Sequence, residues 1–426
     1  MKCRYEINVE FFGVLIKDSE KSTNYQADTL LRDIFLMLSN NTDYSSFIEK
    51  YKNEINLTEF LEILLDLIND KYINLNYNIG NLQAKSGILS APLKVFYDIT
   101  YQCNLRCKHC FTRSGSKNKN ELTLEEKMNL IDDLSELGVK KISIAGGEPL
   151  ICNDFIPFVR KCTDKGIKVS FTTNATLITK DIIIELSKLD IDNITVSLDG
   201  HDPESIEIIR GKNTYDKILK GLDNLHKYYK KNYAIKTTMM KTNIKHLEDI
   251  IRIGIKNGCS TVKFNCVRPD GNANDNSSLV LLSQDEYINA VKEIENLKNK
   301  FENQIRIKGP LNIFCKEQYD FMPELGFGCF AGKETLCISP IGDIKPCTHF
   351  PKEFICGNVR DRNIKEIWEN SPILEMFRKN NGNDKCNNCS NYNHCRGGCR
   401  YRAYLSGSLE GIDPYCYLYK NIGEDC

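Results

Sequence analysis

The sequence has no surplus of charge of either sign. It contains 57 lysines and arginines and 57 aspartates and glutamates in 426 residues, so its formal net charge is zero. Proteins that hold a polyanion along its length usually carry a basic excess. The composition therefore argues against a nucleic-acid partner, and the length allows two or three domains with a sizeable core.

Long hydrophobic runs are also missing. No stretch approaches the roughly 18 apolar residues that a membrane-spanning helix requires. The apolar run at 11–16 is too short for the core of a signal peptide, and no cleavage site follows it. These absences predict a cytoplasmic protein that makes no contact with a membrane.

Cysteine is abundant, yet it is not dense enough for a disulfide scaffold. The chain has 19 cysteines, about 4% of its residues, whereas disulfide scaffolds reach roughly 8–10% in short secreted chains. In a reducing compartment, fixed cysteine spacings indicate metal sites instead. Disulfides remain the weaker alternative.

The rest of the chain is organised around the motif Cys103-x3-Cys107-x2-Cys110, which follows a strand-like run at 95–99. Three thiolates on one loop can hold a tetrahedral zinc or an iron–sulfur cluster, and either leaves one coordination position open. At this cysteine content the spacing should arise by chance on the order of 0.04 times per chain. The motif therefore predicts a metal site without deciding between the two metals.

From residue 93 the sequence alternates between strand and helix patterns. The first helix is marked by the capping box Thr123-x-x-Glu126 and by a stop at Gly138. Six βα repeats predict an α/β fold, with a parallel sheet curved into a partial (β/α)6 TIM barrel and function at the carboxyl ends of its strands. The expected strands are at 94–99, 140–145, 168–173, 193–198, 234–239 and 261–267.

Polar motifs follow the second, third and fourth of these strands, in chain order. The two glycines of a Gly-Gly-Glu-Pro motif would let the backbone approach a ligand closely. Each motif alone could be a turn or a solvated charge, but together at one rim they indicate a ligand site. The candidate residues are Gly146, Gly147, Glu148, Asn174, Ser197, Asp199 and Arg210.

A second field of cysteines occupies the C-terminal part of the chain. Seven ordered thiols exceed one tetrahedral site, so two zinc ribbons and two iron–sulfur clusters are the alternatives. Strand runs at 336–339 and 343–345 around Pro340-Ile341-Gly342 predict a hairpin, and alternation leaves the direction of Cys337 open. The seven are Cys329, Cys347, Cys386, Cys389, Cys395, Cys399 and Cys416.

Residues 1–85 form a separate unit without a cysteine pattern or paired acids. Strand material at 5–16 is broken at Gly13, and amphipathic helices are expected near 27–38 and 57–69, with a closing strand at 72–75. This order predicts a small winged-helix-like module. Its simplest interpretation is a packing or dimerisation domain.

The barrel motifs resemble those of the radical SAM superfamily. In that family, cysteines placed like Cys103, Cys107 and Cys110 hold a [4Fe–4S] cluster whose fourth iron binds S-adenosylmethionine (SAM). The resemblance implies that the Gly-Gly-Glu-Pro motif holds the SAM amino group. It also implies that the residues after the fourth strand lie near the ribose, and that Arg210 meets the carboxylate.

The C-terminal cysteines resemble the SPASM domain of radical SAM enzymes that modify peptides and proteins. The resemblance implies a first auxiliary cluster on Cys329, Cys347 and Cys399. Its fourth ligand is open between Cys337, Cys315, Cys356 and a substrate thiolate. A second auxiliary cluster is implied on Cys386, Cys389, Cys395 and Cys416, which makes three [4Fe–4S] clusters in all.

The N-terminal module is similar in pattern to the PqqD-like peptide-recognition domain. The expected domains are therefore this module at 1–85, a linker at 86–92, the radical SAM barrel at 93–310 and the iron–sulfur SPASM domain at 311–426. The resemblance implies a maturase of a ribosomally made precursor peptide that binds the peptide's leader. A flavodoxin- or ferredoxin-type protein would donate electrons.

Thioether formation between a cysteine sulfur and a carbon is the leading expected reaction. C–C crosslinking or another peptide oxidation is the first alternative. Tetrapyrrole side-chain decarboxylation is a second, because the surroundings of Cys399 also resemble such enzymes. A zinc-stabilised binding scaffold without enzymatic activity is the third.

Overall fold

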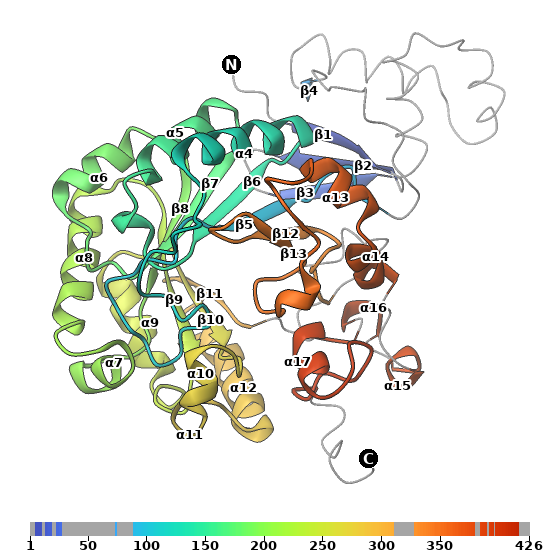
Figure 1. Cartoon of the computed structure of the whole chain (residues 1–426). Coiled ribbons are helices and arrows are strands. Elements are labelled where there is room, and N and C mark those ends of the chain that lie inside the picture. The colour runs from blue at the N-terminus through green and yellow to red at the C-terminus, as the bar shows by residue number, and fades with distance from the viewer. Residues whose placement is uncertain are drawn as a thin grey trace, which may run out of the picture. The chain divides into compact units, whose positions relative to one another are not determined.

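The computed structural model describes residues 88–310, 328–379, 384–389, 392–395 and 397–416, together with four short strands near the N-terminus (Figure 1). The chain divides into two compact units. One comprises residues 1–90 with 315–327, and the other comprises residues 91–314 with 328–426. The domain boundaries expected from the sequence stay predictions.

The N-terminal unit contains a four-stranded sheet in the order β3-β2-β1-β4. β1 (Tyr5–Glu10) and β2 (Gly13–Asp18) pair antiparallel, so the strand material predicted at 5–16 forms two strands, and Gly13 begins the second instead of breaking the run. β3 (Thr23–Ala27) pairs antiparallel with β2. β4 (Ile73–Asn74) lies within the predicted closing strand and pairs parallel with β1. The two helices expected in this unit lie outside the described residues, except that Ala27 ends β3.

The second unit is built on a ten-stranded sheet in the order β11-β10-β9-β8-β7-β6-β5-β12-β13-β14. The neighbouring strands from β5 to β11 are all parallel, which confirms the predicted partial barrel. Its strands are β5 (Lys94–Asp98), β6 (Lys141–Ala145), β7 (Lys168–Thr173), β8 (Ile191–Ser197), β9 (Tyr233–Met239), β10 (Thr261–Cys266) and β11 (Arg306–Lys308).

Helices cover the outer face of this sheet (Figure 1). The ring of Tyr97 on β5 packs 5.1 Å from that of Phe158, and Phe171 on β7 packs 4.9 Å from Phe155. Alternate strand residues therefore face the barrel interior. The helices are α4 (Leu124–Leu137), η2 (Pro149–Ile151), α5 (Phe155–Asp164), α6 (Lys180–Ser187), α7 (Pro203–Arg210), α8 (Tyr215–Tyr228), α9 (Leu247–Lys256), α10 (Asn272–Asp275), α11 (Ser277–Val280) and α12 (Gln284–Lys300).

The predicted boundaries of α4 are confirmed by its caps. Thr123 accepts a hydrogen bond from the Glu126 amide, and Glu126 accepts one from the Thr123 amide at 2.7 Å. Gly138 ends the helix at φ +98°, a left-handed conformation that glycine adopts without steric cost. No described helix is both long and apolar enough to cross a membrane.

The cysteine-rich C-terminal part continues the barrel sheet. β12 (Thr335–Ile338) pairs parallel with β5, and β13 (Asp343–Lys345) turns back antiparallel to it, which confirms the predicted hairpin. The turn glycine Gly342 has φ +88°. The remaining elements are β14 (Gly357–Asn358), η4 (Lys352–Phe354), α13 (Ile364–Asn370), α14 (Pro372–Lys379), α15 (Asp384–Asn387), α16 (Tyr392–Cys395) and α17 (Arg400–Leu405).

Candidate active site

The three-cysteine loop begins at the carboxyl end of β5 and is closed by its own backbone. The Cys103 amide donates to the Gly115 carbonyl at 2.9 Å, and the Gly115 amide donates to the Tyr101 carbonyl at 2.8 Å. Arg106 reinforces the closure by donating to the Cys103 carbonyl at 2.7 Å. The loop therefore presents its thiols from a defined backbone instead of a free segment.

The segment that enters α10 supports the opposite side of the loop. Asn272 donates from Nδ2 to the Cys107 carbonyl at 3.0 Å and from its amide to the Cys110 carbonyl at 2.8 Å. Gly271, at φ +55°, passes so close that a Cβ would lie 2.3 Å from the Phe111 carbonyl oxygen. Only glycine fits there, so the segment between β10 and α10 is held in direct contact with the cysteine loop.

The two glycines after β6 serve the same kind of close approach. A Cβ on Gly146 would lie 2.4 Å from the Thr100 carbonyl oxygen, and one on Gly147 would lie 2.0 Å from that of Gln102. The Gly147 amide donates to the Thr100 carbonyl at 2.7 Å. The glycine motif is thus bonded to the backbone just before Cys103.

Glu148 is fully buried and turns away from the open space. Its carboxylate accepts hydrogen bonds from Thr173 Oγ1 at 2.7 Å, from the Asn174 amide at 2.7 Å and from the Leu150 amide at 3.2 Å. Burial raises its pKa above the ordinary value, although these hydrogen bonds oppose the rise. The structure gives Glu148 a positioning role toward Asn174, and its direct contact with SAM stays a prediction.

Asp199 is also fully buried, where it holds Arg210. It accepts hydrogen bonds from the Arg210 guanidinium and from the Thr238 amide at 2.8 Å, and it lies 3.3 Å from His109 Nε2. Burial alone would raise the pKa of Asp199, but Arg210 and then His109 keep it below its ordinary value. Asp199 is therefore ionised at neutral pH, and it fixes both partners.

Burial lowers the pKa of His109 to about 4, so the imidazole is neutral at pH 7. Its Nδ1 and the Nε of Arg210 are buried and have no hydrogen-bond partner among the described residues. Buried polar atoms are nearly always bonded in native proteins. Two unpaired atoms beside the same three cysteines indicate a ligand.

These groups enclose a cavity of about 210 Å³ at the carboxyl ends of the strands. Glu148 and Asp199 stand behind its wall, and the other candidates from the barrel motifs form part of it. The predicted residues that line the cavity are Cys103, Cys107, Cys110, Gly146, Gly147, Asn174, Ser197 and Arg210.

Further charged or titratable residues outside the candidate set also line the cavity, among them Lys236, Arg268, Asp270 and His349. Arg268 NH1 lies 3.0 Å from His349 Nε2, and because a guanidinium only donates, this imidazole nitrogen accepts. His349 Nδ1 therefore donates to the Asp270 carboxylate. No fixed spacing marks single residues of this kind.

The donor set fits a multi-atom cluster better than a single ion. With Zn–S bonds of ~2.3 Å, the sulfurs around one zinc lie within about 3.8 Å of one another. Among the described residues, only His201, His246 and Asp249 bring three ligand atoms within 4.8 Å of one another. The three cysteines are thus spaced more widely around their cavity, as an iron–sulfur cluster requires.

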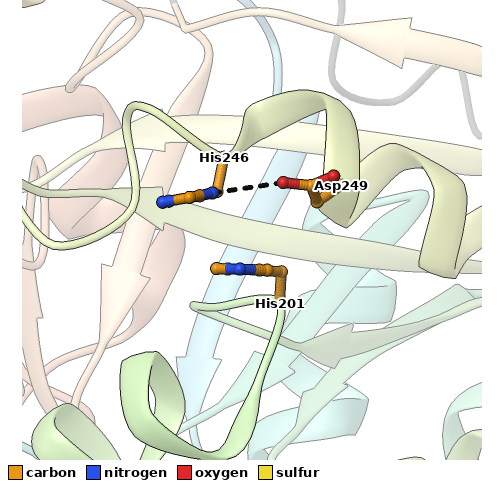
Figure 2. Close-up of side chains that lie close together, drawn as sticks. All are labelled: His201, His246 and Asp249. Carbon is orange, nitrogen blue, oxygen red and sulfur yellow. Dashed lines mark hydrogen bonds and ion pairs between the residues drawn. The ribbon is translucent and has the colours of Figure 1, made fainter.

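His201 and His246 lie close to Asp249, but their rings are not arranged to bind one metal ion (Figure 2). The rings of His201 and His246 stack with centroids 4.0 Å apart and planes 12° apart. A metal ion bound by an imidazole nitrogen lies near the plane of that ring. Two nearly parallel rings this far apart have no position near both planes where one ion could bind both. His246 Nδ1 already contacts Asp249 at 3.1 Å.

The structure brings together the three cysteines predicted to hold the first auxiliary cluster. Cys329, Cys347 and Cys399 all belong to one packed cluster around Phe350. Burial raises the pKa of Cys347 to about 11, and the neighbouring thiols of Cys329 and Cys399 add to the rise while Arg268 opposes it. Burial raises the pKa of the Cys337 thiol, and the nearby thiol of Cys347 raises it further.

The second predicted set also converges. Burial raises the pKa of Cys395 to about 12, with further increments from Cys416, Asp413 and Cys386. The Cys389 amide donates to the Cys386 carbonyl at 3.0 Å. Of the remaining cysteines in the barrel, Cys162, Cys259 and Cys266 are buried, whereas Cys152 is only partly buried.

Comparison with known proteins agrees with this geometry. Residues 97–253 match the model of the radical SAM superfamily, and residues 329–390 match the SPASM iron–sulfur cluster-binding domain. Mycofactocin maturase MftC of Mycobacterium tuberculosis is 29% identical over 331 residues, which cover 77% of this chain and 83% of MftC. An AdoMet-dependent heme synthase of Methanosarcina barkeri is 28% identical over 349 residues, which cover 77% of this chain and 97% of the heme synthase.

Solved structures share the fold over nearly the whole chain. The crystal structure of Streptococcus suis SuiB bound to S-adenosylmethionine has a TM-score of 0.77 at 20% identity, and it covers 97% of this chain and 99% of SuiB. SuiB bound to its precursor peptide SuiA gives 0.74 at 21% identity, with coverage of 96% and 97%. At these identities the likeness establishes the fold.

Proposed function

The chain belongs to the radical SAM superfamily and carries a SPASM domain, and we propose that it matures a ribosomally made precursor peptide. Radical SAM proteins bind SAM and a [4Fe–4S] cluster, and SPASM domains bind auxiliary clusters. The observation that carries the proposal is the shared cavity wall. The three-cysteine loop forms one part of it, and Arg268 and His349, beside the first auxiliary set, form another.

Cys103, Cys107 and Cys110 would hold the SAM-binding cluster, and the two auxiliary cysteine sets would hold one [4Fe–4S] cluster each. When bound, cluster and SAM supply a 5′-deoxyadenosyl radical that abstracts a hydrogen atom from the substrate. A flavodoxin- or ferredoxin-type protein would supply the electron. The protein's own task is to bind, orient and exclude water from the cavity.

Arg210 would bind the SAM carboxylate. Asp199 holds one of its nitrogens, and the buried Nε has no partner among the described residues, so it can donate to a ligand. A guanidinium held in this way binds carboxylates without having to be ordered first. Ser197 and Asn174 add polar contacts at the neighbouring strand ends.

We propose thioether formation as the reaction. Joining a cysteine sulfur to a carbon removes two hydrogens, one as an atom and the other as a proton and an electron. That electron needs an acceptor near the cavity. Arg268 lines the cavity, and its raised pKa, which burial opposes, reflects the nearby thiols of Cys399 and Cys347. An acceptor held by these cysteines would lie beside that wall. C–C crosslinking has the same electron balance and is the alternative within this class.

Heme synthase relatives support a second candidate, tetrapyrrole side-chain decarboxylation. A peptide is the favoured substrate, because the relatives include a peptide maturase and a structure bound to its precursor peptide.

The N-terminal module would read the leader of the precursor. In its sheet as described, β3 pairs on one side only, with β2. An edge strand offers unpaired amide and carbonyl groups to which a leader can add as a further strand. This binding would resemble that of the PqqD-like domain suggested by the sequence pattern.

The test is anaerobic reconstitution of the full chain, followed by iron and sulfide counting and incubation with SAM, dithionite and candidate precursor. The proposal predicts three clusters per chain and a peptide that loses two hydrogens per crosslink by mass spectrometry. Zinc in place of iron would leave the binding scaffold as the interpretation. Loss of carbon dioxide from a tetrapyrrole would establish the second candidate.

A further inference from the structure

The inner face of the partial barrel carries an unusual row of lysines. Residues that pack against the helices, such as Val262, Phe264 and Ile307, are buried and apolar, whereas their neighbours along each strand face inward and are only partly buried. On six strands an inward position is a lysine. These are Lys94 on β5, Lys141 on β6, Lys168 on β7, Lys236 on β9, Lys263 on β10 and Lys308 on β11.

The strand register places these lysines directly opposite one another. Lys263 lies between Lys236 on one side and Lys308 on the other, and Lys141 lies opposite Lys168. Like charges at such positions destabilise a sheet. Burial, followed by the positive charges of Lys263 and Lys141, lowers the pKa of Lys94 to about 8.

No carboxylate among the described residues forms an ion pair with any of the six. Lys263 donates to Thr195 Oγ1 at 3.4 Å, and Lys94 lies over the Phe96 ring at 4.8 Å. The acids whose charges reach the row are Asp192, Asp98 and Asp199, and burial raises the pKa of Asp98 to about 6. The row therefore keeps a clear excess of positive charge.

This inner face is open and joins the active-site cavity. Phe96 lies in the middle of a strand but is 37% exposed, so the space beside the lysines is not filled by side chains. Lys236 and Asn265 line the cavity next to the three-cysteine loop. Lys263 and Lys308 continue from Lys236 across the neighbouring strands, so the positive row starts at the site of chemistry.

We propose that the lysine row binds an acidic segment of the precursor peptide and so places the residues next to that segment in the cavity. This inference rests on the proposed function and specifies its substrate. Neighbouring strands lie ~4.8 Å apart, and side chains on one face of an extended peptide repeat about every 7 Å. Cations spread over six strands match distributed carboxylates better than a compact polyphosphate.

The direct test is binding to the full, reconstituted enzyme, with SAM but without reductant. The probe is a fluorescein-labelled peptide of alternating glycine and glutamate, and its counterpart replaces each glutamate by glutamine. The lumen variant is K94Q/K263Q/K308Q. Its charge-matched control is K188Q/K220Q/K379Q, at exposed positions on outer helices.

The wild type and the control should bind the glutamate peptide more tightly than the glutamine peptide, and binding should weaken as salt rises. The lumen variant should lose about tenfold or more in affinity, because each charge-assisted hydrogen bond is worth about a factor of ten. Equal binding of the two peptides would overturn the inference, and so would unchanged binding by the lumen variant. Binding of inorganic triphosphate by an enzyme that does not bind the glutamate peptide would also overturn it.

Thermal unfolding separates a binding role from a structural one. Removing mutually repelling lysines should raise the unfolding temperature of the lumen variant above that of the control. A lower temperature would mean that the lysines support the fold, and it would count against the inference. Precursor mass loss is scored separately. Wild-type activity in the lumen variant refutes only the lysine row, whereas no mass loss in the wild type refutes the proposed function.

Discussion

Arg402 holds the buried carboxylate of Asp413 through two hydrogen bonds, from Nε to Oδ1 at 2.7 Å and from NH2 to Oδ2 at 2.6 Å. The same carboxylate accepts the Cys399 amide at 2.8 Å, and the Cys416 amide donates to the Asp413 carbonyl at 2.8 Å. Cys399 belongs to the first auxiliary set and Cys416 to the second. One ion pair therefore ties both sets together.

Replacing Asp413 by alanine would leave the Arg402 charge buried without its partner. Breaking a buried pair in this way costs about 3–5 kcal/mol. We expect Asp413→Ala to lower the thermal unfolding temperature and to reduce iron at both auxiliary sets, while SAM cleavage per remaining three-cysteine cluster persists. Glu375→Ala, which breaks an exposed pair with Lys379, is the control and should change little. Full auxiliary iron in Asp413→Ala would contradict this role.

Glu126 and Arg360 join α4 to the segment after β14, and they make the free energy of unfolding depend on pH. The hydrogen bond from Arg360 lowers the pKa of Glu126 from 4.5 to about 2. Because the pKa of Glu126 is lower in the folded protein than in the unfolded chain, the ionised carboxylate stabilises the folded protein at pH values above 4.5. This stabilisation is lost as the pH falls from 4.5 to about 2. The pair is partly exposed, so we expect less than ~1 kcal/mol.

Chemical denaturation of Glu126→Gln across that pH range measures the contribution. The difference in unfolding free energy between wild type and variant should be largest near neutral pH and should shrink as acid is added. A difference that stays constant from pH 6 to about pH 2 would show that the ion pair contributes nothing.

Glu148 and Ser197 should affect SAM binding in different ways. Ser197 lines the cavity and can lose one hydrogen bond to the ligand, worth ~0.5–1.5 kcal/mol. Glu148→Ala would remove three hydrogen bonds that set the Asn174 segment, so we expect a larger loss of SAM affinity with all clusters intact. Isothermal titration with SAM compares the two variants. Equal and negligible losses would make both residues scaffold.

Proline substitutions in β3 test leader binding at this edge. Successive residues of a strand direct their amides to opposite sides of it. Of the two substitutions Asn24→Pro and Tyr25→Pro, one therefore removes an amide that points to the open edge of the sheet, and the other removes an amide that bonds to β2. The outward substitution should weaken leader binding without lowering the unfolding temperature. Titration of the full enzyme with a synthetic leader peptide measures this. Unchanged affinity in both variants would leave the packing-domain interpretation.

The sequence was sufficient for the order of the first six barrel strands and for the three cysteines and five rim residues that line the cavity. Alternation of buried residues and the caps of α4 are local signals, and the glycine and cysteine spacings point to one rim because parallel strands end together. The sequence could not show that the carboxylates of Glu148 and Asp199 turn away from the cavity, because spacing does not determine side-chain direction.

Long-range pairing accounts for what the sequence missed. β12 joins β5 across more than two hundred residues, and this pairing brings His349 to Arg268, which also lies near Cys399 and Cys347. The lysine row depends on register between strands, since only the register places Lys236 and Lys308 on either side of Lys263. No motif in the sequence marks either arrangement.

The central claim is that Cys103, Cys107 and Cys110 hold the cluster that cleaves SAM. The decisive measurement is 5′-deoxyadenosine released under dithionite by the triple alanine variant, compared with wild type and with Cys152→Ala as the control. The variant should fold, keep the iron of its two auxiliary clusters and release no 5′-deoxyadenosine, whereas the control should match wild type. Ample release by the triple variant would contradict the claim.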